Sequence, residues 1–445
     1  MNTHTGRRFD TVAVADRQGV VACDSTLCAR IGADVLAQGG SAADAAVAVS
    51  AALSVVEPCA CGLGGDAWYM LFDAKRGEVS CLDGCGPTPA AFTQAKLSSL
   101  GFTPSSKPRN GDAVMVTVPG VVGAWCQLHA SAHSAGRHSL ADLLRPAADL
   151  AKRGFLITEF ILEALNASFE DLSDLWASRT DGTEPPAEAA AQLLSDENIA
   201  KRASSLKKDD VVFRAQPHAV DKRTLDGDTT YFCVVDKDGN AASVVYSNYI
   251  KIGTSLVPRG CGFTLHNRGM QAFEYERGNY GPSRRTFHTL CAGMLTRDGA
   301  DGRQLLQAPF GVMGGQNQPQ AHLQLLLSML ELGQSPQQAL DQPRVMTRFR
   351  FDDHSRAALL ENRRSEQELA ALERLLVAKG HKVTSFSSDA LLNLLMTGVS
   401  FGRGHVISKG AWWDRSGRYA QDDNRWFAAS DSRSDGYPVV TPLLE

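Results

Sequence analysis

The chain has 445 residues, of which 43% are hydrophobic and 21% are charged, as in an ordinary globular protein. Its formal net charge of −4 gives no electrostatic reason to expect binding to nucleic acid or to an anionic membrane. No apolar stretch is long enough to span a bilayer, and residues 1–8 are not followed by the apolar run of a secretory signal. We therefore expect a cytoplasmic protein with neither a nucleic-acid nor a membrane partner.

The first 60 residues predict two helices. Residues 26–38 carry apolar side chains at helical spacing and end at two glycines, after which Ser41 can cap a second helix. That second helix, residues 42–55, is almost wholly Ala, Val and Leu, so we expect it to be buried on all sides. Pro58 ends it.

The next part of the chain predicts two strands and a third helix. A glycine-rich turn at residues 62–65 leads into a strand at 67–72, and a second strand follows at 79–82. Residues 139–154 have helical spacing, with a serine at the start and a glycine at the end. Residues 181–210 are rich in Ala, Glu, Asp, Ser and Lys, which predicts a linker.

After residue 228 the pattern changes to strands. Two β-prone runs, 229–235 and 241–246, are joined by Asp-Lys-Asp-Gly-Asn, a strong hairpin signal. Helical spacing returns at 321–332 and at 366–379. Because strands and helices are grouped in blocks, we predict an α+β fold with layers of antiparallel sheet and helix.

The ten cysteines do not form a recognisable metal or redox motif. They are scattered, mostly in apolar runs, and none has Cys-x-x-Cys spacing, so we expect buried thiols, no metal and no cofactor. No glycine-rich stretch is followed by Gly-Lys-Ser or Gly-Lys-Thr, which argues against a nucleotide-binding protein. The cysteines are Cys23, Cys28, Cys59, Cys61, Cys81, Cys85, Cys126, Cys233, Cys261 and Cys291.

Thr229 follows Asp226-Gly227-Asp228, a tight segment just ahead of a strand. A threonine hydroxyl is a poor nucleophile unless a base lies beside it. If Thr229 is the first residue of its own chain, its α-amine, with a pKa near ~8, can take the proton. An internal threonine reaches that state only when the bond before it is cut, so we predict a cleavage site between Asp228 and Thr229.

The predicted hairpin places a second hydroxyl beside Thr229. If Val235 pairs with Ala241, the pairing continues outward until Thr229 lies opposite Ser247. Opposed side chains lie about 4.5–5.5 Å apart at Cβ, so the Ser247 hydroxyl could hydrogen-bond Thr229 and orient it. An ordinary hairpin that begins with a threonine is the alternative interpretation.

A glycine-rich loop, residues 311–316, precedes the helix predicted at 321–332. Consecutive glycines such as Gly314 and Gly315 let backbone N–H groups converge on an oxyanion. A loop that only needs positive φ is the alternative.

Several motifs in this order resemble the gamma-glutamyltranspeptidase family and its acylase-like relatives. The similarity extends over nearly the whole chain. The matching segments are 31–46 (ending Gly-Gly-Ser-Ala-Ala-Asp-Ala-Ala), 55–58 (Val-Val-Glu-Pro), 62–65 (Gly-Leu-Gly-Gly), 227–231 (Gly-Asp-Thr-Thr-Tyr), 235–240 (Val-Asp-Lys-Asp-Gly-Asn), 311–315 (Gly-Val-Met-Gly-Gly), 318–320 (Gln-Pro-Gln), 339–344 (Ala-Leu-Asp-Gln-Pro-Arg), 380–381 (Gly-His) and 430–433 (Ser-Asp-Ser-Arg).

The resemblance implies a self-processing amide hydrolase and acyltransferase with a four-layer αββα sandwich in a single compact domain. Residues 1–228 would be the large-subunit portion and 229–445 the small-subunit portion, and the two cleaved chains would remain associated. A homo-oligomer is compatible with it, and the substrate would be a small amide. Its implied site is Thr229 as nucleophile, Ser247 as its hydroxyl partner, Gly314 and Gly315 as oxyanion donors, and Asn248 in contact with the acyl group.

The substrate-binding positions depart from the family pattern. The family's arginine position falls in residues 82–87, which contain no arginine, and its serine pair falls at His288 and Thr289. Its acidic and amide positions fall near Arg268, whose guanidinium would suit a carboxylate. We therefore predict that Arg268, His288 and Thr289 bind an acyl group that carries a carboxylate and lacks the γ-glutamyl amine. The alternatives are a surface arginine paired with a glutamate at 274 or 276, and a structural histidine.

A second departure leaves a different class of function open. The large-subunit segment that the family has near residues 193–211 is nearly absent here, and Asp66 stands where the family usually has glycine. A non-catalytic paralogue that keeps the fold as a binding or structural protein is therefore the alternative to the enzyme.

Overall fold

The computed structural model describes residues 11–14, 18–102, 108, 111–155, 228–250, 252–271, 281–349, 356–387, 401–415 and 425–442. The predicted linker at 181–210 and the segment 193–211 lie outside these residues.

A six-stranded antiparallel sheet contains the predicted hairpin at its centre. The two portions of the chain alternate in it, because β5 lies between β2 and β6, and β6 lies between β5 and β3. In spatial order the strands are β14 (Val439–Val440), β2 (Val20–Cys23), β5 (Asp228–Val235), β6 (Ala241–Tyr249), β3 (Asp66–Asp73) and β4 (Glu78–Gly84).

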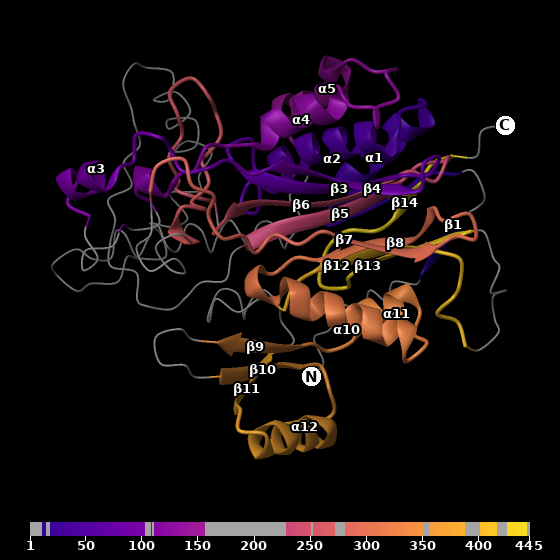
Figure 1. Cartoon of the computed structure of the whole chain (residues 1–445). Coiled ribbons are helices and arrows are strands. Elements are labelled where there is room, and N and C mark those ends of the chain that lie inside the picture. Colours follow the sequence, from indigo (N-terminus) through magenta and orange to yellow (C-terminus); the bar gives the residue numbers. More distant parts are fainter. Residues whose placement is uncertain are drawn as a thin grey trace.

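A five-stranded antiparallel sheet lies against the first sheet, and a three-stranded sheet lies beyond it (Figure 1). The five strands, in spatial order, are β1 (Val12–Val14), β13 (Trp426–Ser430), β12 (Gly404–Lys409), β8 (Gln304–Val312) and β7 (Gly293–Asp298). The three are β11 (Lys382–Ser387), β10 (Arg356–Asn362) and β9 (Val345–Phe349), of which β10 and β11 run parallel.

Helices cover the outer faces of the two larger sheets. Figure 1 shows α1, α2, α4 and α5 over the six-stranded sheet, and α10 and α11 over the five-stranded sheet. The helices are α1 (Thr26–Ala37), α2 (Ala42–Val56), α3 (Gln94–Ser99), α4 (Val121–His129), α5 (Leu140–Arg153), α10 (Gln318–Leu330), α11 (Pro336–Asp341) and α12 (Glu366–Ala378), with 3₁₀ turns η1 (Ala113–Met115) and η2 (Gly315–Asn317).

Local sequence explains the helices that were predicted. Ser41 caps α2 as expected, with a reciprocal hydrogen bond between its backbone N–H and the side chain of Asp44. Ser139 caps α5 in the same way, and Gly154 ends it with a φ of 77°. Helix α10 begins at Gln318, three residues before the predicted start, because the proline after Gln318 occupies the first turn, where no N–H is needed.

Apolar side chains fill both spaces beside the six-stranded sheet. One core lies between the six-stranded sheet and the helices α1, α2, α4 and α5 that cover it. Ala45, Val49 and Leu53 of α2 are fully buried in this core. The second core lies between the two large sheets and includes Tyr231 and Ile407. The predicted antiparallel layers of sheet and helix are therefore present.

The cysteines only partly match the expectation. No disulfide joins any of the ten, which all lie in the described residues, but Cys81, Cys126 and Cys261 are exposed and Cys291 is half-buried. None of the described helices has the length and apolar character needed to cross a bilayer.

Candidate active site

The hairpin formed by β5 and β6 has the predicted register at its turn. Val235 pairs with Ala241. The carboxylate of Asp236 accepts hydrogen bonds from the backbone N–H groups of Asp238 and Asn240, at 3.0 and 2.9 Å, and Gly239 takes a φ of 84°. The turn therefore fixes the register of the strands that follow it.

Thr229 and Ser247 are hydrogen-bonded at the other end of the hairpin. The Thr229 hydroxyl donates to the Ser247 hydroxyl at 3.1 Å, and both residues are buried. The pairing is less regular than predicted, because the register shifts between Asp228 and Thr230. Tyr249 has a φ of 77° and donates its N–H to the Ser247 oxygen at 2.7 Å. This bulge fixes the Ser247 hydroxyl beside Thr229.

A buried ionic network lies directly behind Thr229, and the sequence analysis missed it. The hydroxyl of Thr230 donates to Asp24 at 3.1 Å, and Asp24 also contacts His405 at 3.0 Å and Arg403 at 3.4 Å. Burial alone would raise the pKa of Asp24, but Arg403 and His405 hold this pKa below its usual value. The network ties β5 to the end of β2 and to β12. In the sequence, this network is indicated by Asp24, a charged residue directly after the apolar strand that ends at Cys23.

The glycine loop follows β8 and has the backbone conformation that glycine allows. Gly314 and Gly315 have φ values of 132° and 55°, which other residues rarely adopt. Earlier in the strand, a side chain at Gly311 would meet the ring of Tyr231 at 2.4 Å, so β8 packs closely on β5. His322 accepts the N–H of Val312 at 2.9 Å, and burial lowers its pKa to about 4, so it is neutral. The role of Gly314 and Gly315 as oxyanion donors stays a prediction.

Asn248 is fully buried and keeps an acceptor without a partner. Its side-chain N–H donates to the carbonyl of Pro58 at 3.3 Å, while its Oδ1 has no hydrogen-bond partner among the described residues. A side chain at Gly65 would come within 2.9 Å of that oxygen. The Gly-Leu-Gly-Gly turn therefore leaves the space that Asn248 occupies.

Arg268 is neither a surface residue nor an open carboxylate receptor. It is fully buried, and its guanidinium donates to both oxygens of Asp66, at 2.7 and 2.9 Å. Its remaining NH1 group lies 3.4 Å from Gln271 and from Thr289. The fork that the sequence assigned to a substrate carboxylate is thus occupied by Asp66. The alternative of a surface arginine is also wrong, because Arg268 is fully buried, while the glutamates at 274 and 276 lie outside the described residues.

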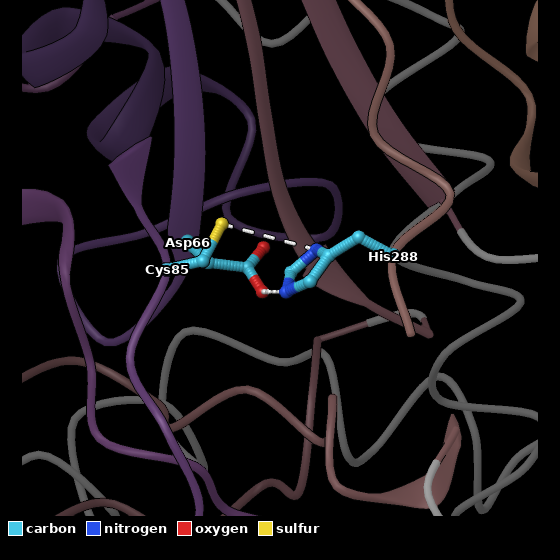
Figure 2. A group of neighbouring side chains, drawn as sticks. All are labelled: Asp66, Cys85 and His288. Atoms are coloured by element: carbon cyan, nitrogen blue, oxygen red, sulfur yellow. Dashed lines mark hydrogen bonds and ion pairs between the residues drawn. The ribbon is translucent and has the colours of Figure 1, made fainter. Parts of the chain in front are cut away.

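His288 and Thr289 come together with Arg268, as the sequence predicted, but around Asp66. The His288 imidazole lies with Nδ1 at 3.8 Å from the Cys85 thiol and Nε2 at 4.0 Å from Asp66 (Figure 2). Burial and Arg268 lower the pKa of His288 to about 4, so the ring is neutral. Burial and the Asp66 carboxylate raise the pKa of the Cys85 thiol far above its usual value.

This cluster is connected to the hairpin. Asp66 is the cross-strand partner of Ser247 between β3 and β6, and the Arg268 guanidinium stacks over the ring of Tyr249 at 4.5 Å. Burial alone would raise the pKa of Asp66, but Arg268 and His266 hold this pKa well below its usual range, so Asp66 is ionised. The predicted substrate-binding positions therefore lie next to the pair formed by Thr229 and Ser247.

Comparison with known proteins gives a consistent family and fold. The family described as Gamma-glutamyltranspeptidase matches residues 28–186 and 161–440. A glutathione hydrolase-like YwrD proenzyme of Bacillus subtilis is 25% identical, over 72% of this chain and 83% of its own length. A glutathione hydrolase proenzyme of the same organism is 35% identical, over 35% of this chain and 26% of its own length. Cephalosporin acylase from Bacillus halodurans has a similar structure, with a TM-score of 0.70 and 21% identity over 99% of this chain and 98% of its own.

Proposed function

Because the chain belongs to the gamma-glutamyltranspeptidase family and is a hydrolase of the glutathione hydrolase-like kind, we propose that it processes itself and then cleaves small amides through Thr229. The observation that carries this proposal is the buried hydrogen bond of 3.1 Å between the hydroxyls of Thr229 and Ser247 at the start of β5. The relatives named glutathione hydrolase proenzyme support a chain that matures by cleavage.

In the proposed maturation step, the Thr229 hydroxyl oxygen attacks the carbonyl carbon of Asp228. The peptide C–N bond breaks as an ester to the Thr229 oxygen forms, and the freed nitrogen becomes the α-amine of Thr229. Water then hydrolyses the ester, which releases the carboxyl group of Asp228. Ser247 accepts the hydroxyl proton of Thr229 in a hydrogen bond and so orients the oxygen for attack.

In the proposed turnover, the same oxygen attacks the substrate amide while the α-amine of Thr229 takes its proton. The backbone N–H groups of Gly314 and Gly315 stabilise the oxyanion, and Asn248 contacts the acyl group. The leaving amine receives the proton, and an acyl ester on Thr229 remains. Water releases the acid, or an amine acceptor takes the acyl group and gives a new amide.

We also propose that residues 1–228 and 229–445 stay together after cleavage in one four-layer αββα domain. The six-stranded sheet supports this, because β5 and β6 of the second portion lie between β2 and β3 of the first. Separating the portions would break both the β2–β5 and the β3–β6 ladders and expose two apolar cores.

Self-cleavage tests the proposal directly. Purified protein incubated without protease is expected to convert into two chains that separate on a denaturing gel but co-elute in size-exclusion chromatography. Sequencing of the smaller chain should begin Thr-Thr-Tyr-Phe-Cys. A protein that stays a single chain after prolonged incubation would favour the binding or structural paralogue.

For the acyl group, we propose one that carries a carboxylate and lacks the α-amine. The Asp66 carboxylate that could hold an ammonium is already bound on both oxygens by Arg268. A carboxylate would then be held by the NH1 group of Arg268, which Asp66 does not bind, and by the Thr289 hydroxyl.

A comparison of three anilides tests this specificity. Matured enzyme is expected to hydrolyse glutaryl p-nitroanilide faster than γ-glutamyl p-nitroanilide, since an ammonium beside a guanidinium costs free energy in a desolvated site. The uncharged butyryl anilide is the control for the carboxylate. A higher kcat/KM for the γ-glutamyl compound would contradict the assignment, and equal values for glutaryl and butyryl would remove the carboxylate from it.

A further inference from the structure

Four polar side chains converge at one end of β3, beside the proposed catalytic pair. The Asp66 carboxylate, the Cys85 thiol and one nitrogen of His288 lie within 4.8 Å of one another. They come from separate parts of the chain, namely the start of β3, the residue after β4, and the segment before β7. Figure 2 shows the three side chains pointing toward a common point.

The fourth side chain, His266, lies against the same carboxylate. His266 Nε2 lies 3.0 Å from both the hydroxyl and the carbonyl oxygen of Thr117. The Nδ1 atom is fully buried, has no hydrogen-bond partner among the described residues, and lies 3.5 Å from an oxygen of Asp66.

We propose that Asp66, Cys85 and His288 bind a thiophilic divalent cation of the Zn²⁺ type. Sulfur, imidazole nitrogen and carboxylate oxygen are the ligands that Zn²⁺ takes in proteins, and three protein ligands leave a fourth position for water or substrate. Nδ1 of His288 lies 3.8 Å from the thiol and Nε2 lies 4.0 Å from the carboxylate, so a single ring nitrogen would ligate the ion, together with the thiol and the carboxylate, within the 4.8 Å that separates the three ligand atoms. On binding, the Cys85 thiol loses its proton to solvent.

The surroundings suit such an ion. The Arg268 guanidinium donates hydrogen bonds to the Asp66 carboxylate. Carboxylates that ligate a metal are commonly oriented by hydrogen bonds of this kind. The thiolate and the carboxylate offset the two positive charges of the ion. With the guanidinium included, one positive charge remains, which the protein can bury more easily than a bare dication. The His288 side chain is 13% exposed, which gives the ion a path to the site.

Cobalt binding to metal-free protein tests the site without relying on catalysis. We would use the full chain with Thr229→Ala, dialysed against a chelator, so that self-cleavage plays no part. This protein is expected to bind one Co²⁺ per chain and to show a thiolate-to-cobalt charge-transfer band. Cys85→Ser should lose the band and bind at least about tenfold more weakly. Cys81→Ser, which changes an exposed cysteine on β4 just before Cys85, should keep both.

Several results of the cobalt experiment would reject the metal site. Absence of the band in the parent protein, its persistence in Cys85→Ser, or its loss in Cys81→Ser would overturn the proposal. If Cys85→Ser does not fold, His288→Gln is the second variant, and unchanged cobalt affinity there would also overturn it. Circular dichroism checks the fold of each variant.

The effect on hydrolysis rests on the proposed function. Because Asp66 pairs with Ser247, a bound ion would lie beside the catalytic hydroxyls, and Zn²⁺ is expected to inhibit matured enzyme but not its Cys85→Ser variant. Cobalt binding without any amide hydrolysis would leave the metal site standing and reject the catalytic proposal. Hydrolysis without cobalt binding would support the catalytic proposal and reject the metal site.

Discussion

Replacing Thr229 with alanine is expected to abolish both self-cleavage and amide hydrolysis. The hydroxyl that attacks Asp228 and the hydroxyl that attacks the substrate are the same atom in the proposed mechanism, so one substitution removes both reactions. The rate with an anilide substrate should fall by at least about 10⁴-fold. A denaturing gel over time and steady-state kinetics measure the two effects. Cleavage at residue 229 in the alanine variant would mean that another group makes the cut.

Ser247 provides the matched comparison for Thr229. The Ser247→Ala variant removes one orienting hydrogen bond but keeps the nucleophile, so it should mature and turn over roughly tenfold more slowly, equivalent to about 1–1.5 kcal/mol. Thr229→Ser should retain partial activity, because an oxygen remains at the same position. Unchanged kinetics in a folded Ser247→Ala variant would show that the hydrogen bond has no part in catalysis.

Local features of the sequence predicted the parts of the site that depend on neighbouring residues. The turn at 236–240 fixed the hairpin because Asp236 binds the backbone of that same turn, and counting outward then reached Thr229 and Ser247. The two helix caps at Ser41 and Ser139 were predicted for the same reason, since each depends on a partner three residues away.

Contacts between residues that are far apart in the sequence could not be predicted from local patterns. Asp66 and Arg268 are 202 positions apart, and no local pattern shows that two such charges meet in a buried site. The same holds for Cys85 and His288, which are 203 positions apart and lack the close spacing of a known metal motif. The bulge at Tyr249 was also missed, because a non-glycine residue with positive φ is set by its tertiary surroundings rather than by its own preference.

The largest expected effect on stability comes from breaking the pair of Asp66 and Arg268. In Arg268→Ala the Asp66 carboxylate stays buried without its counter-ion, which should lower the free energy of unfolding by about 3–5 kcal/mol at pH 7. The matched control is Arg285→Ala. Arg285 also pairs with an aspartate, Asp83, but its side chain is 60% exposed, so its loss should cost about 1 kcal/mol or less. Urea unfolding in the single-chain Thr229→Ala background measures both.

The pH dependence of this loss identifies its cause. The folded pKa of Asp66 is lowered by Arg268, so the pair stabilises the protein fully above the unfolded carboxyl pKa of about 3.9 and loses that contribution as the pH falls below it. Without Arg268, burial should raise the pKa of Asp66, so acid neutralises the carboxylate and removes the penalty. The difference between Arg268→Ala and its parent should therefore shrink from pH 7 to pH 4, while that of Arg285→Ala should stay small. A difference that is constant over this range would mean that lost packing of the Arg268 side chain, rather than an unpaired charge at Asp66, destabilises the variant.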